Sequence, residues 1–405
     1  MNDATLIHWL AEGGLRNLPL ERIVDGYARR LNAAGVPVAR AFVGTSTLHP
    51  MIRARSMIWE RSTGPATRFE FHHFEIDAPQ LRQSPFMPML SDRVFARRVD
   101  LADPSAVAGV PVFEELHAAG MTEWLGRVFP FGELTPRIGD AEHVQHVGEL
   151  WFVCSFATDR PGGFTADQIA ALDASLPVFA VAAKASTMLS TSHGLLAAYL
   201  GDDPAARVLA GSVRRGEVQS VEAVLFFADL QGFTALADAL PGAALIDLLD
   251  SHLGSMVQPV VAHGGEVLKF MGDGLLATFA VVGADREGVC ADALRAAGDV
   301  LERVERQNAA RAAAGKPTAI VDISLHIGRV LYGNVGGEAR LDFTVIGPAV
   351  NEAARIEALC GPLDRRLLVS QAFAAACGAD RKRLVSLGHH RLRGVREPAE
   401  LFTLA

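Results

Sequence analysis

Runs of apolar residues in the first half of the chain predict a mixed α/β domain. Between Pro19 and Ala34 the apolar residues recur with the spacing of one helical face, and Gly35 closes the segment. Short apolar runs then predict strands, and the polar, proline-containing stretch 79–91 predicts a loop. The predicted strands are 38–45, 56–60, 68–76 and 149–157.

A long apolar helix is predicted near the middle of the chain. Thr165 and Gln168 have the spacing of a capping box, so a helix is expected to begin there. Pro177 is expected to kink or interrupt it, because proline has no backbone N–H to donate. The segment 178–200, roughly 35 Å long as a helix, then continues to Gly201. Such a helix is typical of a connector between domains, and an ordinary packed helix fits the same pattern.

In the second half, the pattern changes to strand, helix and strand. An apolar run at 221–227 predicts a strand, and the helical stripe that follows ends at Gly264 and Gly265. Met271-Gly-Asp-Gly274 separates two short strands, so a hairpin is expected in which the glycines supply positive φ. The other predicted elements are strands 266–270, 275–280, 318–329, 384–387 and 401–404, and a helix at 351–359.

Composition indicates an ordinary globular protein of two or three domains. The chain has 405 residues, of which 50% are apolar and 21% charged. Its formal net charge of −8 argues against nucleic acid, which is usually bound by a basic face. The four cysteines are far apart without zinc spacing, so reduced and mostly buried thiols of a cytosolic protein are expected: Cys154, Cys290, Cys360 and Cys377.

We expect a cytoplasmic protein without a membrane span. The first residues lack the basic segment and long apolar run of a signal peptide. The most apolar stretch, 176–183, is broken by Lys184 and is shorter than the ~20 residues that cross a bilayer.

Two carboxylates in apolar surroundings are the first candidates for chemistry. Asp229 follows the predicted strand 221–227, and Asp273 lies in the predicted hairpin. A carboxylate beside buried strands is costly unless a cation or hydrogen bonds compensate it. Two carboxylates can hold two cations in the clamp used for displacement at phosphorus, and hard oxygen ligands favour Mg²⁺ or Mn²⁺. Either aspartate alone is more often a helix cap or a turn residue.

A third segment carries polar groups suited to a phosphate ester. Asn351 and Arg355 are four residues apart at the start of a predicted helix and therefore share a face. Gly347, just before them, permits close approach of the backbone to a ligand. Arg355 offers a planar fork for phosphate oxygens, while Asn351 can donate and accept. Taken alone, such a pair is more often a solvated helix face.

Together the three segments resemble the signature segments of the class III nucleotidyl cyclases. Phe-Ala-Asp-Leu-Gln-Gly-Phe-Thr, Lys-Phe-Met-Gly-Asp-Gly and Thr-Val-Ile-Gly-Pro-Ala-Val-Asn-Glu-Ala-Ala-Arg occur in the family's order. The resemblance covers about residues 205–405. It implies an α+β fold with a ferredoxin-like βαββαβ core, in a head-to-tail homodimer whose active sites are shared.

The same resemblance implies site roles. Asp229 and Asp273 would hold two Mg²⁺ or Mn²⁺ ions, with the carbonyl of Leu230 as a further ligand. Asn351 would orient the ribose, and Arg355 would stabilise charge on the α-phosphate. The implied reaction converts ATP to 3′,5′-cyclic AMP and pyrophosphate by attack of the ribose 3′-hydroxyl.

Lys269 and Thr344 match the family positions that read the purine. Lys269 can only donate, which suits N1 of adenine, and the Thr344 hydroxyl can accept from the N6 amino group. Guanine reverses that pattern, so adenine is expected. Arg340 lies near the position of a family arginine that contacts the triphosphate, and we retain it as a weaker substrate-binding candidate.

Residues 1–177 carry no catalytic signature. A strand at 151–157, followed by Asp159-Arg-Pro-Gly-Gly-Phe164 and a long helix, loosely resembles a GAF-type sensory domain. The predicted organisation is therefore a GAF-like regulatory domain at 1–177, a connecting helix at 178–204 and an adenylate cyclase catalytic domain at 205–405. The first domain is expected to bind a small-molecule or protein regulator, or to serve only in dimerisation. A guanylate or mixed-specificity cyclase and a catalytically silent nucleotide-binding module remain alternatives.

Overall fold

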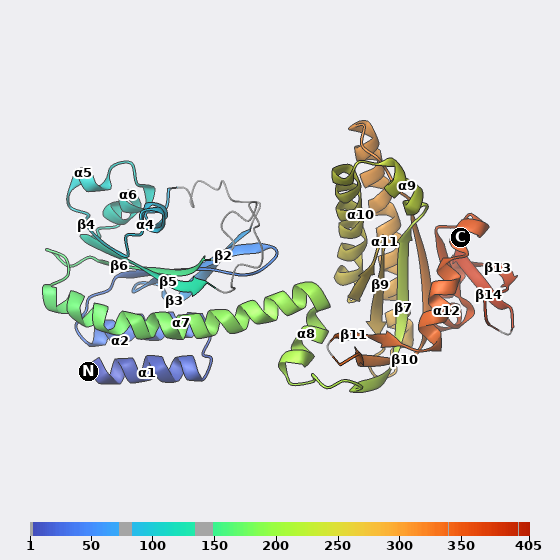
Figure 1. The fold of residues 1–405 in the computed structure, drawn as a ribbon, viewed down its shortest axis with the longest axis horizontal. Coiled ribbons are helices and arrows are strands. Elements are labelled where there is room, and N and C mark those ends of the chain that lie inside the picture. The colour runs from blue at the N-terminus through green and yellow to red at the C-terminus, as the bar shows by residue number, and fades with distance from the viewer. Residues whose placement is uncertain (1–2, 73–82, 134–148, 339, 396) are drawn as a thin grey trace. The chain divides into compact units, whose positions relative to one another are not determined.

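The computed structural model describes residues 3–72, 83–133, 149–338, 340–395 and 397–405. The chain forms two compact units, Met1–Ala198 and Tyr199–Ala405, and each is described by itself (Figure 1). The division falls within the predicted connecting segment 178–204.

The N-terminal unit is built on a six-stranded antiparallel sheet with the strand order β3-β2-β1-β6-β5-β4. Its strands are β1 (Arg40–Ser46), β2 (Ile52–Glu60), β3 (Gly64–His72), β4 (Ala96–Asp100), β5 (Glu123–Glu133) and β6 (Glu149–Thr158). The predicted strands at 38–45, 56–60 and 149–157 are confirmed. The prediction at 68–76 is confirmed to His72, and its remainder lies outside the described residues.

Helices cover both faces of this sheet (Figure 1). One face packs against α1 (Asp3–Leu15), α2 (Leu20–Ala33) and α7 (Ala166–Leu200), and the other against α4 (Phe86–Ser91), α5 (Pro104–Val107) and α6 (Pro111–Ala118). The predicted helix at 19–34 is α2. The loop prediction for 79–91 is wrong at α4, because Phe86 and Met89 are buried in the core on that face.

Helix α7 runs through Pro177 without interruption, so of the expected kink or interruption at this proline, the interruption is wrong. Its start is the predicted capping box: the Gln168 N–H donates to Thr165 Oγ1 at 3.3 Å, and the Thr165 N–H donates to Gln168 Oε1 at 2.9 Å. An interior proline costs about 3 kcal/mol. Burial of Leu172, Leu176 and Phe179, each contributing about 1.5–3 kcal/mol, outweighs that cost.

By length and composition, α7 is also the one helix among the described residues that is long and apolar enough to cross a membrane. In its most apolar window, 39% of the residues are buried within the structure. The face that includes Leu176, Phe179 and Ala183 belongs to the core of the N-terminal unit. Core helices of globular domains commonly meet the same criterion, so this helix is only weak evidence for a membrane span.

The C-terminal unit contains a ferredoxin-like core. The order along the chain is βαββαβ, from β7 (Val218–Leu230) through α9 (Phe233–Ala239), α10 (Gly242–Ala262), β8 (Glu266–Met271), β9 (Gly274–Ala280) and α11 (Arg286–Ala313) to β10 (Val321–Gly336). These strands pair antiparallel in the order β10-β7-β9-β8. The predicted core is confirmed. Its second helix is α11, which the βαββαβ order implies but which was not located in the sequence.

The remaining elements extend this core. They are α8 (Asp202–Leu209), β11 (Leu341–Ile346), α12 (Pro348–Glu357), α13 (Cys360–Leu363), β12 (Leu367–Ser370), α14 (Gln371–Ala376), β13 (Leu384–His390) and β14 (Ala399–Leu404). Strand β12 continues the sheet beside β10, followed by β14 and β13, while β11 pairs separately with β10.

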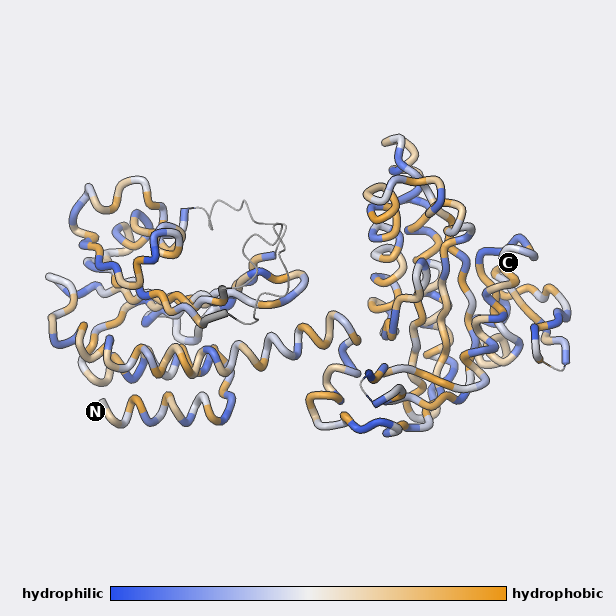
Figure 2. The backbone as a smooth tube through the Cα atoms, in the orientation of Figure 1, coloured by the Kyte–Doolittle hydropathy of each residue, from blue (hydrophilic) through white to orange (hydrophobic). Residues whose placement is uncertain are grey.

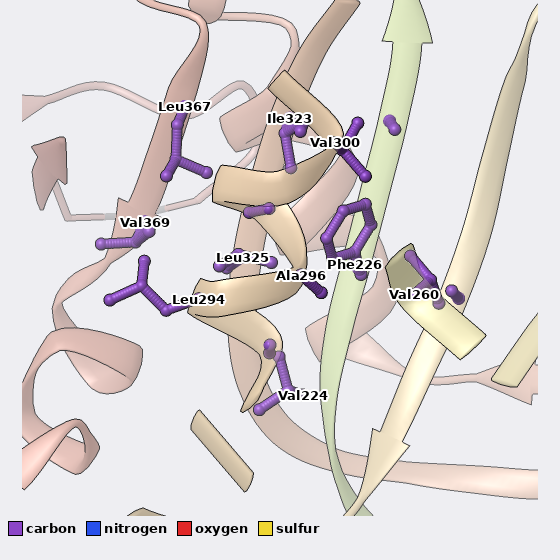
Figure 3. Packing of buried hydrophobic residues seen from close by; sticks show 14 of the residues in the cluster. Val224, Phe226, Val260, Leu294, Ala296, Val300, Ile323, Leu325, Leu367 and Val369 are labelled. Atoms are coloured by element: carbon purple, nitrogen blue, oxygen red, sulfur yellow. The ribbon is translucent and has the colours of Figure 1, made fainter. Parts of the chain in front are cut away.

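Apolar side chains from α10 and α11 pack on one face of the C-terminal sheet. Figure 3 shows Phe226 of β7 between Val260 of α10 and Val300 of α11, with Leu325 of β10 nearby. In Figure 2 the strands of this sheet show hydrophobic stretches interrupted by hydrophilic positions, as in β10, where Ile323 and Leu325 alternate with Asp322 and Ser324. All four cysteines lie in the described part of the chain, buried and without a disulfide, as predicted.

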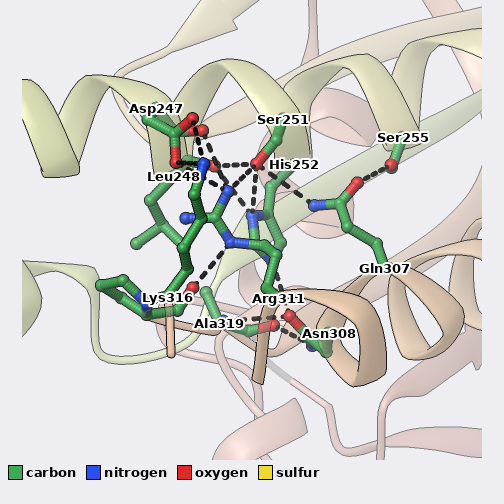
Figure 4. Close-up of polar contacts among 11 residues, drawn as sticks. Asp247, Leu248, Ser251, His252, Ser255, Gln307, Asn308, Arg311, Lys316 and Ala319 are labelled. Carbon is green, nitrogen blue, oxygen red and sulfur yellow. Dashed lines mark hydrogen bonds and ion pairs between the residues drawn. The ribbon is translucent and has the colours of Figure 1, made fainter. Parts of the chain in front are cut away.

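A polar network anchors the end of α11 to α10 and to the loop before β10 (Figure 4). The buried Arg311 guanidinium donates to Ser251 Oγ at 2.9 Å and to the Pro317 carbonyl at 2.7 Å. Its Nη1 also lies 3.0 Å from the Asp247 carboxylate. A buried charge is stable only when it is paired and hydrogen-bonded. This network therefore fixes the loop before β10 against α10 and α11.

Candidate active site

The two predicted metal-ligand aspartates meet at one end of the sheet. Asp229 lies near the end of β7, and Asp273 lies in the turn between β8 and β9. The pairing of Ala228 with Leu275 places Asp229 beside Gly274. A Cβ at Gly274 would lie 2.5 Å from Asp229 Oδ1 and 2.5 Å from the Ala228 carbonyl oxygen. The close approach of the two strands therefore requires glycine.

The hairpin differs in one detail from its prediction. Met271 pairs with Gly274, so Gly272 and Asp273 are the two turn residues. Gly272 has φ +72°, but Gly274 does not adopt positive φ. Gly274 is needed for space beside Asp229 rather than for backbone freedom.

Burial disfavours the ionised form of both carboxylates, and the charge of Asp273 adds to this effect at Asp229. The pKa of Asp229 is raised from 3.8 to about 6, chiefly by burial and then by the charge of Asp273, with a smaller contribution from Asp322. Burial also raises the pKa of Asp273. Groups with such shifts are concentrated at functional sites.

Two further acidic residues of this site were missed by the sequence prediction. Asp322 on β10 pairs in register with Asp229, and its carboxylate accepts from Arg366 at 3.1 Å. Glu357, at the end of α12, has its pKa raised to about 7, first by burial and then by Asp229, Asp322 and Asp273. A charged residue inside the apolar run 318–329 could have marked Asp322 as a site candidate in the sequence. Glu357 is brought to the site only by the tertiary fold.

The donor set fits hard divalent cations. Two facing carboxylates whose ionisation is suppressed by burial gain most from a positive charge between them. Carboxylate oxygen suits Mg²⁺ and Mn²⁺ better than softer metals. In the part of the chain that the structure describes, no group of three or more His, Cys, Asp or Glu side chains converges as a ready-made ligand set. Ligands beyond the two aspartates would come from backbone, water or substrate.

The predicted base-reading residues lie on β8 and β11. Lys269 Nζ donates to Asp342 Oδ2 at 3.2 Å, so the two strands are joined by an ion pair. The Thr344 hydroxyl is buried and has no hydrogen-bond partner among the described residues. A buried polar atom without a partner is costly, which makes Thr344 Oγ1 a natural contact for a ligand.

Asn351 and Arg355 lie on α12, as predicted. The helix begins at Pro348 after Gly347, whose φ of +149° few other residues adopt. Asn351 is exposed, and the Arg355 guanidinium lies near Gly394, with Nη2 3.5 Å from the place that a Cβ on that glycine would occupy. Arg355 therefore reaches toward the loop between β13 and β14, whereas Glu357 on the same helix acts electrostatically on the aspartates.

Two candidates have less distinctive surroundings. The Leu230 side chain is buried in the core of the C-terminal unit, so only its backbone is free to face the aspartates. Arg340 is exposed in the turn between β10 and β11, where its carbonyl accepts from the Gly337 N–H at 2.9 Å.

Comparison with known sequences defines the class of this unit. Residues 217–405 match the family described as the adenylate and guanylate cyclase catalytic domain. This segment of the chain therefore belongs to the class III nucleotidyl cyclases. Because the family description includes both activities, membership does not choose the nucleotide.

Individual relatives match the same half of the chain. An uncharacterized protein of Mycobacterium tuberculosis is 37% identical over 190 residues, which is 46% of this chain and 32% of that protein. Adenylate cyclase 1 of Rhizobium meliloti is 30% identical over 173 residues, which is 43% of this chain and 26% of that protein. Among solved structures, the adenylyl cyclase CyaB from P. aeruginosa has 24% identity and a TM-score of 0.42, covering 47% of this chain and 96% of that chain. The chain thus spans about a third or less of the length of these two curated relatives.

Proposed function

We propose that the protein is an adenylate cyclase that converts ATP to 3′,5′-cyclic AMP and pyrophosphate. The observation that carries this proposal is the meeting of Asp229 with Asp273 at the sheet end, where each carboxylate is destabilised by burial. In the reaction, a bond forms between the ribose 3′-oxygen and the α-phosphorus. The bond from that phosphorus to the bridging oxygen breaks, and the hydroxyl proton passes to solvent.

Asp229 and Asp273 would hold two Mg²⁺ or Mn²⁺ ions, with the Leu230 carbonyl as a further ligand. When bound, such ions supply Lewis acidity to the 3′-hydroxyl and the phosphate oxygens. Arg355 would neutralise charge that develops on the α-phosphate, and Asn351 would hold the ribose in line. Arg340, exposed in the turn between β10 and β11, is the candidate for the outer phosphates.

Selection of adenine would come from Lys269 and Thr344. The Lys269 ammonium can donate to N1 while Asp342 orients it, and the unpartnered Thr344 hydroxyl can accept from the N6 amino group. Guanine carries a donor at N1 and an acceptor at C6, so it would meet a donor with a donor at Lys269. Adenine is therefore the favoured base.

Arg355 would serve a site on a second copy of the chain. Its guanidinium lies near Gly394, while the charges that raise the pKa of Asp229 are those of Asp273 and Asp322 of the same chain. A head-to-tail homodimer would bring Asn351 and Arg355 of one copy to the aspartates of the other. Such an arrangement gives two equivalent sites per dimer.

The N-terminal unit is proposed to be a GAF-like regulatory domain that responds to a small molecule or protein. Its six-stranded sheet with helices on both faces is compatible with a sensory module. Leu200, the last residue of α7, is joined through Gly201 to α8 of the C-terminal unit, so the chain itself provides a route for regulation. A cytoplasmic location is proposed for both units.

Purified protein with Mn²⁺ is expected to convert ATP to cyclic AMP at least about tenfold more efficiently than GTP to cyclic GMP. Lys269→Glu is expected to lower kcat/KM for ATP about 100-fold, because the new carboxylate faces both Asp342 and the acceptor N1. Steady-state rates with both nucleotides measure this change. A wild-type protein that makes no cyclic product would leave the silent nucleotide-binding module as the better function.

Lys382→Glu, a charge reversal at an exposed lysine remote from β8, is the matched control. It is expected to retain the wild-type ratio of ATP to GTP turnover. If both variants lost the same kcat/KM for ATP, the effect of Lys269→Glu would be explained by the change in overall charge.

In metal-free protein, Asp229→Asn is expected to stabilise the C-terminal unit at pH 8 and to have no effect at pH 4. Folding raises the pKa of Asp229 from 3.8 to about 6, so the stability contributed by this group is present below 3.8 and is lost as pH rises through 6. The shift corresponds to about 3 kcal/mol, which solvent screening at this half-buried position reduces to about 1 kcal/mol. Thermal denaturation with EDTA across this pH range measures the difference.

Asp250→Asn, at an exposed position on α10, is expected to show no such pH dependence. Addition of Mn²⁺ at pH 8 should stabilise the wild type more than Asp229→Asn, since the variant has lost one charged ligand. The same Mn²⁺-induced rise in melting temperature for both proteins would remove Asp229 from the metal site.

A further inference from the structure

A polar cluster joins α8 to two strands of the C-terminal unit. It consists of Asp203 and Arg207 on α8, Glu266 on β8 and Tyr332 on β10, and we call it the α8 cluster. The Tyr332 hydroxyl lies 2.8 Å from Asp203 Oδ2 and 3.2 Å from Glu266 Oε2. The Asp203 N–H donates to Glu266 Oε1 at 2.8 Å, and Arg207 Nε donates to Asp203 Oδ2 at 2.5 Å.

The charges in this cluster depend on its geometry. One hydroxyl proton can serve only one carboxylate at a time, so Asp203 and Glu266 compete for Tyr332. Burial is the main cause that raises the pKa of Glu266; the hydrogen bond from the Asp203 N–H opposes it, and the Asp203 charge adds to it. The Arg207 guanidinium compensates the charge of Asp203. Movement of α8 would leave two carboxylates and a buried hydroxyl with fewer partners, which is costly.

A bulge in β8 turns Glu266 and Lys269 to the same face of the sheet. Glu266 pairs with Thr278 and Lys269 pairs with Leu276, with Leu268 as the extra residue. Residues three apart on a regular strand point to opposite faces. Here the extra residue shifts the alternation by one position, so Glu266 and Lys269 point to the same face of β8. The hydrogen bonds of Glu266 therefore fix the face of the strand from which Lys269 projects.

Tyr332 connects the same cluster to the second base-reading strand. It pairs with Val345 across the β10–β11 ladder, and its ring meets Phe343 edge-on with centroids 4.9 Å apart. Thr344 lies between those two residues and pairs with Gly333. The Tyr332 ring therefore contacts Phe343 on one side of Thr344, and its backbone pairs with Val345 on the other side. Its hydroxyl bonds to Glu266 on the strand that carries Lys269.

We infer that Tyr332 is a positioning residue for base recognition: its hydroxyl and ring hold Lys269 on β8 and Thr344 on β11 at the spacing of a purine edge. Asp203 and Arg207 on α8 hold Tyr332 in turn. This inference rests on the proposed cyclase function and extends it to residues that do not touch the nucleotide. It also makes base selection depend on the seating of α8.

Tyr332→Phe is the direct test, because it removes the hydroxyl and retains the ring that packs on Phe343. The variant is expected to lower the ratio of kcat/KM for ATP over GTP about tenfold, mainly through KM for ATP, as one buried hydrogen bond is lost. Glu266→Ala is expected to reproduce this loss, and Glu266→Gln, which keeps an acceptor oxygen, to retain most of the selectivity. Steady-state kinetics of the full chain with Mn²⁺ and each nucleotide provide the measurement.

Tyr27→Phe is the matched control, since Tyr27 is a buried tyrosine of the N-terminal unit whose hydroxyl bonds to Ser175 at 2.7 Å. It is expected to lower thermal stability while leaving the ATP to GTP ratio unchanged. If folded Tyr332→Phe keeps the wild-type ATP to GTP ratio and KM for ATP, the inference is overturned. If only Glu266→Ala folds, the same unchanged values in that variant overturn it. Failure of the wild type to form any cyclic product would instead overturn the proposed function on which it rests.

Discussion

Mixing two inactive variants, Asp273→Ala and Arg355→Ala, is expected to restore about one quarter of the wild-type activity. Each variant alone should lose at least about 1,000-fold, since under the proposed function one would lack a metal carboxylate and the other the cation that stabilises charge on the phosphate. In a shared-site dimer, one site of the mixed pair carries both substitutions and the other carries neither. With free exchange, half of the dimers are mixed and half of their sites are intact.

The matched control mixes Asp273→Ala with Asp229→Ala. Both substitutions damage the same half of every site, so no pairing of chains produces an intact one and no recovery is expected. Activity assays after co-refolding or co-expression, with tags that verify mixed dimers, make the comparison. Stable mixed dimers of Asp273→Ala and Arg355→Ala that remain inactive would contradict the shared site and leave Arg355 with a role on its own chain.

Gly274→Ala is expected to abolish activity and to destabilise the C-terminal unit by about 2–4 kcal/mol. The new Cβ would lie 2.5 Å from both Asp229 Oδ1 and the Ala228 carbonyl oxygen. A carboxylate can rotate away, but a paired backbone carbonyl cannot move without breaking the β7–β9 ladder. The substitution would therefore displace Asp229 and disrupt the end of the sheet at the same time. Thermal denaturation measures the loss of stability, and cyclase assays measure the loss of activity.

Gly298→Ala in α11 is the corresponding control, because no atom lies within 4 Å of its added Cβ. Replacing glycine in a helix interior should stabilise the protein by up to about 1 kcal/mol and leave activity intact. A Gly274→Ala protein as stable and active as Gly298→Ala would mean that β7 and β9 do not approach as closely as described.

The parts of the fold that depend on near neighbours in the chain were predictable. The start of α7 follows from Thr165 and Gln168, which satisfy each other's backbone groups three residues apart. The periodic apolar face of α2 was recognised for the same reason. Helix α11 carries an equally readable stripe that includes Leu294, Ala297 and Val304, so its omission was a missed signal rather than a physical limit.

Elsewhere, local preference was overruled by packing. Proline at 177 disfavours a helix, yet burial of its neighbours Leu176 and Phe179 keeps α7 continuous. The proline-containing segment before Ser91 forms α4 because Phe86 and Met89 complete a core on one face of the sheet. Such energies are set by residues distant in the chain, so propensity alone does not predict them.

The amino-acid sequence by itself determined which chemical groups stand at strand ends and turns: Asp229 after a buried run, Asp273 in a glycine turn, and Lys269 just before it. Tertiary structure decided which of them meet. The β7–β10 register sets Asp322 beside Asp229. The path of α12 brings Glu357 within electrostatic reach of the aspartates, while Arg355 lies near Gly394. Charges interact through space and strands pair by register, so these neighbours are properties of the folded sheet rather than of any local segment.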